Sequence, residues 1–510
     1  MNLFSAAFII FIIALLVLYY TIFRKKQWVC LLLFSIAFYA YSGISNLIFM
    51  AVTGVSVFMG GIWLMRFSDQ YHKIRKDKSI DRARRKEIKA AFDKKRRMIL
   101  WTIIVINFGM LAVLKYLHPF FEGFLIPLGI SFYMFISIGY LVDIYFEKYE
   151  AEKNPFRFLL FVSFFPQLIQ GPINRYDQMK EQLYGRHTLD WYRCKRALIL
   201  ILFGLLKKYT IANLLVHEIA NILDAPTEKT PGSAIVFAIL LYSAQQYADF
   251  SGGIDIVMGV AELFGIKMMP NFRQPYFSVS LGDFWRRWHI TLGAWLKDYV
   301  FYPISLAKPV KNLAKKIKKK AGFSVSKFVA PTIALFFVWL SNGIWHGPHM
   351  NYIFYGMYYF VLIVIENLTE EPCRKLVERF KLDTECIGFR IFQFLKLFVI
   401  VNIGEMFFRA DTVATGFRML RRIVTDFHIT ALAETNFGVD VPDLILASVS
   451  ILLVFVVDVI HEKGISIRRK VAECKLPVRW SFWYAVILLV VVFGAYGSGY
   501  TIVDMIYAAY

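Results

Sequence analysis

Long apolar runs separated by short polar or basic stretches set the pattern of the chain. About 18 or more apolar helical residues cross the ~30 Å hydrocarbon core of a bilayer, and runs near this length recur throughout the sequence. A helix is expected in each run because it satisfies every backbone polar group within its own segment. We therefore predict an all-α polytopic membrane protein with twelve spans at about residues 3–22, 27–42, 46–65, 98–117, 123–145, 197–217, 234–262, 328–346, 350–367, 387–408, 443–460 and 480–500.

Two further apolar stretches are too short or too polar to be ordinary spans. Residues 157–169 end at Gln170, which Gly171 and Pro172 follow. Irregular or polar backbone at membrane depth persists only where it is buried in protein or lines a water-filled cavity. For 157–169 a re-entrant segment and a surface amphipathic helix are both open. For 285–305 we expect a cavity lining, because this stretch combines Trp285, Arg286, Arg287, Trp288, His289, Lys297 and Asp298.

Composition and charge agree with a membrane protein that takes no nucleic acid. The chain has 510 residues, 58% of them hydrophobic, and a net charge of +22. The basic residues gather in 66–97 and 308–327, between apolar segments, as expected of cytoplasmic loops. With these segments in the cytoplasm and twelve spans, both termini are external. No polar stretch is long enough for a soluble domain, so residues 1–510 are predicted to form one integral domain.

The segment "LSNGIWHGPHM", residues 340–350, ends a predicted span with polar residues and glycines. Ionisable residues inside a membrane are costly and are functional candidates, and imidazole can move a proton near neutral pH. His346 and, less clearly, His289 and His349 are therefore candidates for acid–base chemistry. The alternative for His346 is a histidine hydrogen-bonded at a helix end, with Gly347 as the cap.

A second polar cluster interrupts the predicted span 234–262. It contains Asp249, Ser251 and Asp255 around a pair of glycines, which allows either a break or a close helix approach. The alternative is a kink in which Asp249 bonds neighbouring backbone. The sequence has no zinc-helix histidine spacing, phosphate-binding glycine loop or serine-nucleophile elbow. We therefore expect neither a metal nor a bound cofactor.

Four blocks make the chain resemble a known family, the membrane-bound O-acyltransferases, and within it the bacterial alginate O-acetyltransferase branch. They are "SFYMFISIGYLVDIY" (131–145), "VSFFPQLIQGPINRY" (162–176), the block at 247–304 that includes "FWRRWHITLGAWLKDYVFYPI", and "GIWHGPHMNYIFYGMYY" (343–359). A weaker fifth block lies at 407–420, and the similarity extends over about 125–420. One departure is Ser305-Leu306-Ala307, where many relatives have Leu-Gly-Gly.

The resemblance implies a ring of tilted helices around a funnel through the membrane. In the family the histidine of the W-H-G motif is catalytic, which here is His346. The histidine of the R-W-H motif, here His289, lies across the tunnel. Trp345 is then expected to wall the tunnel, and Asn342 to bond the imidazole or the acceptor. The further residues expected to line the tunnel or position substrate are Trp285, Arg287, Trp288, Asp249, Ser251, Asp255 and Gln170.

The implied function is acyl transfer across a bacterial plasma membrane. A cytoplasmic thioester, acetyl-CoA or an acyl carrier protein, would donate an acetyl group for O-acetylation of an extracellular or cell-wall polysaccharide. A separate extracytoplasmic transferase protein would complete the reaction. One alternative is transfer of D-alanine toward teichoic acid from a carrier protein. Another is a transporter or flippase, which the lack of paired halves disfavours.

Overall fold

The computed structural model describes residues 3, 5–77, 79–116, 127–225, 227–435, 440–496 and 500. Over these residues the regular structure is helical, without a β-strand. The chain forms two compact units, the first mainly from Met1–Ile199 and Val257–Met269, the second mainly from Leu200–Ile256 and Pro270–Ile506. The prediction of one integral domain stays a prediction, and each unit is described by itself.

The first unit is built around the buried helix α5 (Ile130–Tyr145), which is buried from Ile130 to Ile144. Two glycines of α3 allow close packing on its neighbours, because a Cβ on Gly60 would clash with Ile103 of α4 and a Cβ on Gly61 would meet Ile144 Cδ1 of α5 at 3.1 Å. The other helices of this unit are α1 (Ala6–Tyr20), α2 (Gln27–Tyr41), α3 (Asn46–Lys76), α4 (Arg82–Tyr116), α6 (Pro155–Ser163), α7 (Phe165–Leu168) and α8 (Tyr176–Tyr184).

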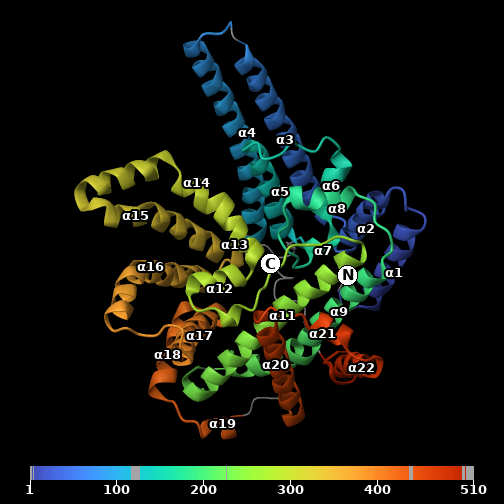
Figure 1. Cartoon of the computed structure of the whole chain (residues 1–510), viewed down its shortest axis with the longest axis vertical. Helices are drawn as coiled ribbons and strands as arrows, with labels where there is room; N and C mark the ends of the chain where they lie inside the picture. The colour runs from blue at the N-terminus through green and yellow to red at the C-terminus, as the bar shows by residue number, and fades with distance from the viewer. Residues whose placement is uncertain are drawn as a thin grey trace. The chain divides into compact units, whose positions relative to one another are not determined.

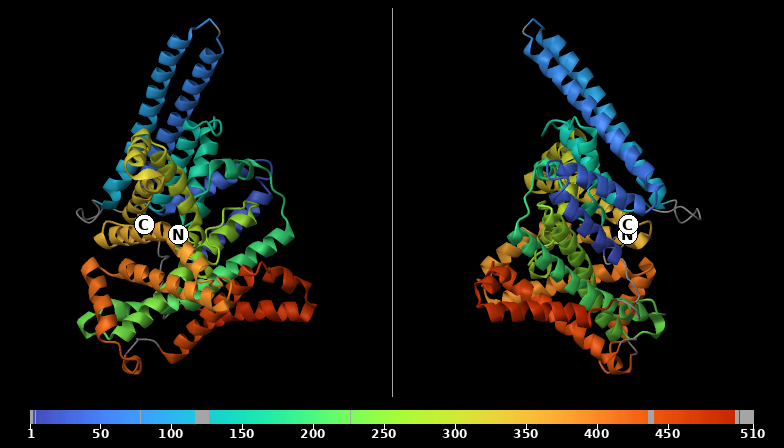
Figure 2. Two further views of the ribbon diagram at one scale, coloured as in Figure 1. Left: turned by 60° about the vertical axis from the view of Figure 1, so that its left-hand side comes forward. Right: turned by 90° about the vertical axis from the view of Figure 1, so that its right-hand side faces the viewer.

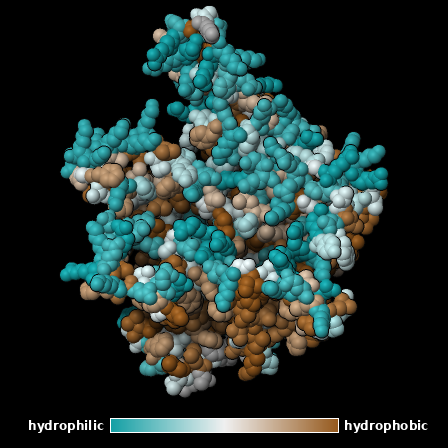
Figure 3. Space-filling view, in the orientation of Figure 1, coloured by the Kyte–Doolittle hydropathy of each residue, from teal (hydrophilic) through white to brown (hydrophobic). Residues whose placement is uncertain are grey.

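The basic stretch 66–97 was predicted as a loop and is largely helical. α3 continues to Lys76 and α4 begins at Arg82, so that the two helices form a long hairpin (Figures 1 and 2). The stretch is rich in Lys, Arg and Ala, which favour a helix even where packing does not require one. The tip of the hairpin is hydrophilic at the top of Figure 3, consistent with a segment that leaves the membrane.

The second unit begins within α9 (Trp191–Lys207), which a π-helical turn η2 (Lys208–Ala212) joins to α10 (Asn213–Leu223). After η3 (Thr227–Lys229), the long α11 (Gly232–Leu263) passes back to the first unit. The chain then continues through η4 (Pro275–Phe277), α12 (Leu281–Arg287), α13 (Ile290–Leu296), η5 (Lys297–Phe301), α14 (Tyr302–Ser305), α15 (Lys308–His346), α16 (Met350–Arg379), α17 (Ile387–Arg409), α18 (Val413–Thr425), α19 (Ala431–Glu434), α20 (Val441–Glu462), α21 (Ile467–Glu473) and α22 (Leu476–Phe493).

The helices agree with the predicted spans and make this a multi-pass membrane protein. Among the described residues, 8 helices are long and apolar enough to cross a bilayer. Three shorter apolar helices (α1, α2 and α5) and α11 account for the other predicted spans. Exposed apolar side chains cover α20 in the lower half of Figure 3, including Ile445, Val449, Leu452, Phe455 and Val456. Residues 4, 117, 123–126 and 497–499 of the predicted spans lie outside the described part.

The two unusual apolar stretches are broken into short helices, none long enough to cross a membrane. Residues 157–169 form most of α6 and all of α7, and Gln170 follows in a left-handed conformation, with φ 59°. Residues 285–305 form the end of α12, then α13, the π-helical η5 and α14. His289 lies at the junction between α12 and α13, also left-handed, with φ 46°. The irregular backbone expected here is therefore present.

Candidate active site

His346 is the last residue of α15, where this helix lies against the first turns of α16 (Figure 1). Two glycines allow the close crossing. A Cβ on Gly343 would meet the Tyr352 carbonyl oxygen at 2.6 Å, and one on Gly356 would meet the Trp339 carbonyl oxygen at 2.4 Å. The crossing therefore holds the end of α15, and with it the imidazole, at a fixed place against α16.

Four aromatic side chains surround the imidazole of His346, which is 5% exposed. The ring centroids lie 4.7 Å from Trp345, 4.9 Å from Phe408, 5.8 Å from Tyr355 and 6.2 Å from Tyr352. The contact with Phe408 is supported from α16, whose Asn351 side chain donates to the carbonyls of Phe408 at 3.1 Å and Ala410 at 2.9 Å. These aromatic walls keep bulk water from the ring.

Asn271 organises the second histidine. Its Oδ1 accepts from the backbone N–H of Thr291 at 3.0 Å and from the Thr291 hydroxyl at 2.9 Å, and it lies 3.2 Å from His289 Nδ1. Because Oδ1 only accepts, Nδ1 is the protonated nitrogen of a neutral imidazole. Burial lowers the pKa of His289 to about 3, which keeps the ring neutral. Nε2 is therefore the basic nitrogen of His289.

The structure brings the two candidate histidines to one indole. Trp345 lies 5.6 Å from His289 and 4.7 Å from His346, measured between ring centroids. His289 also contacts Phe250 edge to face, with ring centroids 4.8 Å apart. All of these residues belong to the second unit. His346, His289 and Trp345, which the sequence singled out in two separate blocks, thus form one cluster.

Asn342 and Trp285 hold polar atoms that the described part of the chain leaves unbonded. Asn342 lies one helical turn before His346 on α15, and its buried Oδ1 has no hydrogen-bond partner among the described residues. The same is true of the buried Trp285 Nε1, whose ring packs against Trp339 and Tyr359 at 4.8 Å each. Buried polar atoms of this kind are available to bond a polar ligand. Trp288, by contrast, is packed in an apolar cluster against Phe272, Phe284 and Tyr247.

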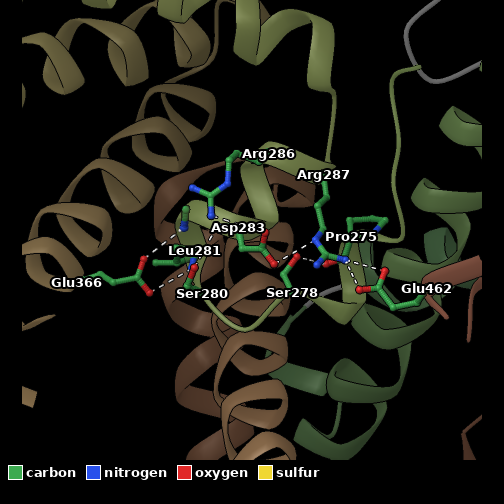
Figure 4. A network of polar contacts seen from close by, with 10 residues as sticks. Pro275, Ser278, Ser280, Leu281, Asp283, Arg286, Arg287, Glu366 and Glu462 are labelled. Carbon is green, nitrogen blue, oxygen red and sulfur yellow. Dashed lines mark hydrogen bonds and ion pairs between the residues drawn. The ribbon is translucent and has the colours of Figure 1, made fainter. Parts of the chain in front are cut away.

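Arg287 forms ion pairs within the protein (Figure 4). Its guanidinium bonds Glu462 at 2.8 and 2.9 Å and Asp283 at 3.0 Å. Burial alone would lower its pKa, but these two carboxylates raise it. Glu366 caps the same helix α12, accepting the backbone N–H groups of Leu281 and Gly282. These contacts fix α12 to α16 and α20, and the expected substrate contact of Arg287 stays a prediction.

The cluster Asp249, Ser251 and Asp255 lies on an unbroken helix and pairs with two lysines of α9 and η2. Lys207 Nζ lies 2.9 Å from Ser251 Oγ and 2.6 Å from Asp255 Oδ2, and Lys208 pairs with Asp249. The glycine pair lets α9 and α11 pack closely. A Cβ on Gly204 of α9 would meet the Gly252 carbonyl oxygen of α11 at 2.5 Å. The break that the glycine pair allowed is absent, since α11 is one helix from Gly232 to Leu263.

The lysine partners were missed by sequence reasoning, although two adjacent lysines closing an apolar run were a usable signal. Gln170 lies in the first unit, with both buried amide atoms unbonded by any described residue, and its expected role stays a prediction. Over the described residues, no group of three or more His, Cys, Asp and Glu side chains is placed to hold a metal ion.

Comparison with known proteins gives a consistent match. The family model described as membrane-bound O-acyltransferase matches residues 151–403, which include both histidines. The chain is 32% identical over 359 residues to a protein named probable alginate O-acetylase AlgI from Pseudomonas fluorescens, covering 69% of this chain and 66% of the relative. It is 28% identical to the peptidoglycan O-acetyltransferase of Helicobacter pylori, covering 64% of each chain.

The teichoic acid D-alanyltransferase of Bacillus subtilis is 30% identical over 49% of this chain and 60% of its own length. The chain spans about three-fifths of the length of the curated relatives that it matches, between 59% and 66% of three proteins named probable alginate O-acetylase AlgI.

Proposed function

The chain belongs to the membrane-bound O-acyltransferase family, and on this premise we propose that it is an O-acyltransferase. It moves an acetyl group from a cytoplasmic thioester donor across the membrane for O-acetylation of a polysaccharide outside. The observation that carries the proposal is the setting of His346. Its imidazole is buried, surrounded by aromatic rings and placed at the end of a membrane-spanning helix.

The proposed chemistry is attack of a hydroxyl on a thioester. His346 takes the hydroxyl proton as the oxygen attacks the acyl carbon, a role that contributes roughly 10²–10⁴-fold in rate. The thioester C–S bond then breaks, and the thiolate leaves with a proton. The Trp285 indole N–H is a donor without a partner among the described residues, and it is suited to the charge that develops on the acyl oxygen. The aromatic walls limit hydrolysis of the donor.

His289 is proposed to act beside this step and not in it. With Nδ1 bonded to Asn271, its Nε2 can accept a hydrogen bond from the acceptor hydroxyl or from the thiol that is released when the acyl group leaves the donor. Trp345 separates its ring from that of His346 and is proposed to wall the tunnel between the donor and acceptor sides. Asn342, with its unbonded Oδ1, is proposed to orient the acceptor.

Acetyl-CoA is the donor that we propose, with an acyl carrier protein thioester as the other candidate. The similarity to relatives named alginate O-acetylase extends over more of this chain than the similarity to the teichoic acid D-alanyltransferase, which favours acetyl over D-alanyl transfer. A separate extracytoplasmic transferase is proposed to complete acylation of the polymer.

The test uses purified protein with acetyl-CoA labelled in the acetyl group, and separately with a labelled D-alanyl carrier thioester. We expect label to leave acetyl-CoA for a hydroxyl acceptor, and His346→Ala to abolish this transfer. His428→Ala is the matched control, because that imidazole is 69% exposed. Near-normal transfer by the folded His346→Ala variant contradicts the assignment. Transfer from the carrier thioester alone would establish the alternative donor.

A further inference from the structure

Glu405 is a buried carboxyl on the membrane-spanning helix α17 that the proposed reaction leaves unused. It is 2% exposed and forms no ion pair with any described residue. An acidic residue at such a place is costly to keep and is a functional candidate by default. In the sequence Glu405 is the one charged residue of the apolar run "FVIVNIGEMFF". It was not among the residues that the sequence motifs selected.

Two side chains hold the carboxyl of Glu405. Both Gln246 of α11 and Tyr355 of α16 hydrogen-bond it. Gln246 bonds through its amide nitrogen, because its Oε1 has no partner among the described residues, and the Tyr355 hydroxyl is the other donor. One carboxyl oxygen, Oε2, is left without a partner among these residues. Glu405 therefore joins three helices of the second unit through its side chain.

Tyr355 connects Glu405 with His346, because its side chain contacts both. Its ring meets the imidazole edge to face, with centroids 5.8 Å apart and an interplanar angle of 85°. It also contacts Phe408 at 5.0 Å, and Phe408 lies 4.9 Å from His346. Phe408 follows Glu405 by three residues on α17, close to one helical turn, so both lie toward the same side of this helix. α17 thus reaches the imidazole directly through Phe408 and indirectly through Glu405 and Tyr355.

The packing next to Glu405 leaves little room for an alternative arrangement. A Cβ on Gly404 would meet the Tyr359 hydroxyl at 2.4 Å, so α17 and α16 are in close contact at this level. Tyr359 in turn stacks on Trp339 at 5.4 Å and contacts Tyr355 at 5.0 Å. Close-packed interiors transmit a local change to their neighbours. Loss of the hydrogen bond to Tyr355 is therefore expected to change the ring's position against His346.

We propose that Glu405 is a positioning residue for acyl transfer, holding Tyr355 against His346 while Gln246 orients the carboxyl. The inference rests on the proposed function of His346. It assigns Glu405 no contact with substrate and no proton transfer. A misplacement of about 1 Å at a reacting group costs up to roughly 100-fold in rate. Loss of an orienting contact of this kind is therefore expected to lower kcat by a measurable factor.

The experiment is a double-mutant cycle on Glu405 and Tyr355, with kcat and KM for the acyl donor measured per folded protein. Glu405→Leu and Tyr355→Phe each remove the hydrogen bond and are expected to lower kcat roughly 10- to 100-fold, with KM changed less than threefold. Glu405→Gln keeps an acceptor oxygen for Tyr355 and is expected to retain most of kcat. The double variant Glu405→Leu/Tyr355→Phe is expected to be no slower than the slower single variant, because both act through one contact.

Three results overturn the proposal: an unchanged kcat in Tyr355→Phe, additive losses in the double variant, or a loss in Glu405→Gln as large as in Glu405→Leu. A purely structural role would lower the folded yield and leave kcat per folded protein unchanged. Tyr355→Phe keeps the ring and decides the matter if Glu405→Leu fails to fold. His346→Ala is assayed in parallel. If it is active, the proposed function fails; if it is inactive while Tyr355→Phe is unaffected, only the role of Glu405 fails.

Discussion

Burial and the contact with Asn271 Oδ1 keep the imidazole of His289 neutral. The free energy of unfolding is therefore expected to depend on pH. Its folded pKa of about 3 lies below the value of about 6.5 for an exposed histidine. Between these values the unfolded chain binds a proton that the folded chain does not. The contribution of His289 to the free energy of unfolding is therefore fully present above pH ~6.5 and is lost progressively as the pH falls below that value.

We accordingly expect the unfolding midpoint of the detergent-solubilised protein to fall between pH 7.5 and pH 5, and to fall less in His289→Gln. Glutamine keeps an amide donor near Asn271 but cannot take up a proton in this range. The measurement is thermal unfolding of both proteins at the two pH values. An equal fall in both would show that His289 does not carry this part of the pH dependence.

Asn271 is the other residue on which this arrangement depends. Its Oδ1 serves His289 and both donors of Thr291, and its backbone carbonyl accepts from Ile290 at 3.0 Å. Asn271→Ala removes the acceptor that His289 and both Thr291 donors share, and a buried polar group that loses its hydrogen bond costs about 1–3 kcal/mol. We expect a lower unfolding midpoint together with reduced acyl transfer. Retention of both in Asn271→Ala would contradict the assigned role.

At the scale of elements, the crossing of α15 and α16 fixes the end of α15 and therefore His346. Gly343→Ala would place a methyl group 2.6 Å from the Tyr352 carbonyl oxygen, which is backbone and cannot move away cheaply. Overpacking of this kind costs about 1–3 kcal/mol. We expect Gly343→Ala to lower both the unfolding midpoint and acyl transfer.

Gly388→Ala on α17 is the matched control, because its added methyl group meets nothing within 4 Å of the described structure. An exposed helical glycine replaced by alanine is expected to be neutral or stabilising by about 0.5–1 kcal/mol. Equal effects of the two substitutions would argue against a critical crossing at Gly343.

The spans were predictable because a helix that crosses the membrane needs an apolar run, which the sequence shows directly. The contact between Trp345 and His346 was predictable too, because the two residues are adjacent in the chain. The partners of Asp249 and Asp255 were not. Lys208 and Lys207 precede them by more than 40 residues, and a π-helical turn sets their direction. Asn271 was missed for a similar reason, since its function depends on the left-handed backbone at His289 and no local pattern reports that.

At the scale of the whole molecule, orientation follows from charge. The hairpin of α3 and α4 and the first part of α15 carry the basic segments 66–97 and 308–327, which are predicted to be cytoplasmic. The three exposed native cysteines, Cys373, Cys386 and Cys474, lie in 368–386 and 461–479, which the twelve predicted spans place on the same side. We expect a membrane-impermeant thiol reagent to label none of them in intact cells and all of them after permeabilisation.

Cysteines introduced at Ser79 and Ala321, in a background without the three exposed thiols, extend this test to the basic segments. Both are expected to be protected in intact cells. Labelling of either before permeabilisation would show that the orientation is inverted. The twelve predicted spans place segment 409–442 outside, so a cysteine introduced there provides the positive control.

The last expectation concerns a partner protein. In the described part of 409–442 the regular structure is limited to the end of α17, α18, α19 and the start of α20, too little for a separate catalytic domain. The polymer lies outside, whereas His346 is buried among aromatic rings that a polysaccharide chain cannot enter. We therefore expect the acetyl group to pass first to a hydroxyl side chain of a separate external transferase, which then acylates the polymer.

Reconstitution decides between this relay and direct transfer. Vesicles hold the protein with labelled acetyl donor on the cytoplasmic side and polysaccharide on the other, and an external transferase is added or omitted. Labelled polymer is expected only when the transferase is present. The label is expected to appear first on the transferase and later on the polymer. Vesicles with His346→Ala give the background from spontaneous donor hydrolysis. Full acetylation of the polymer without the transferase would show that the membrane enzyme acts directly, and the narrow aromatic surroundings of His346 would then have to open to admit a chain end.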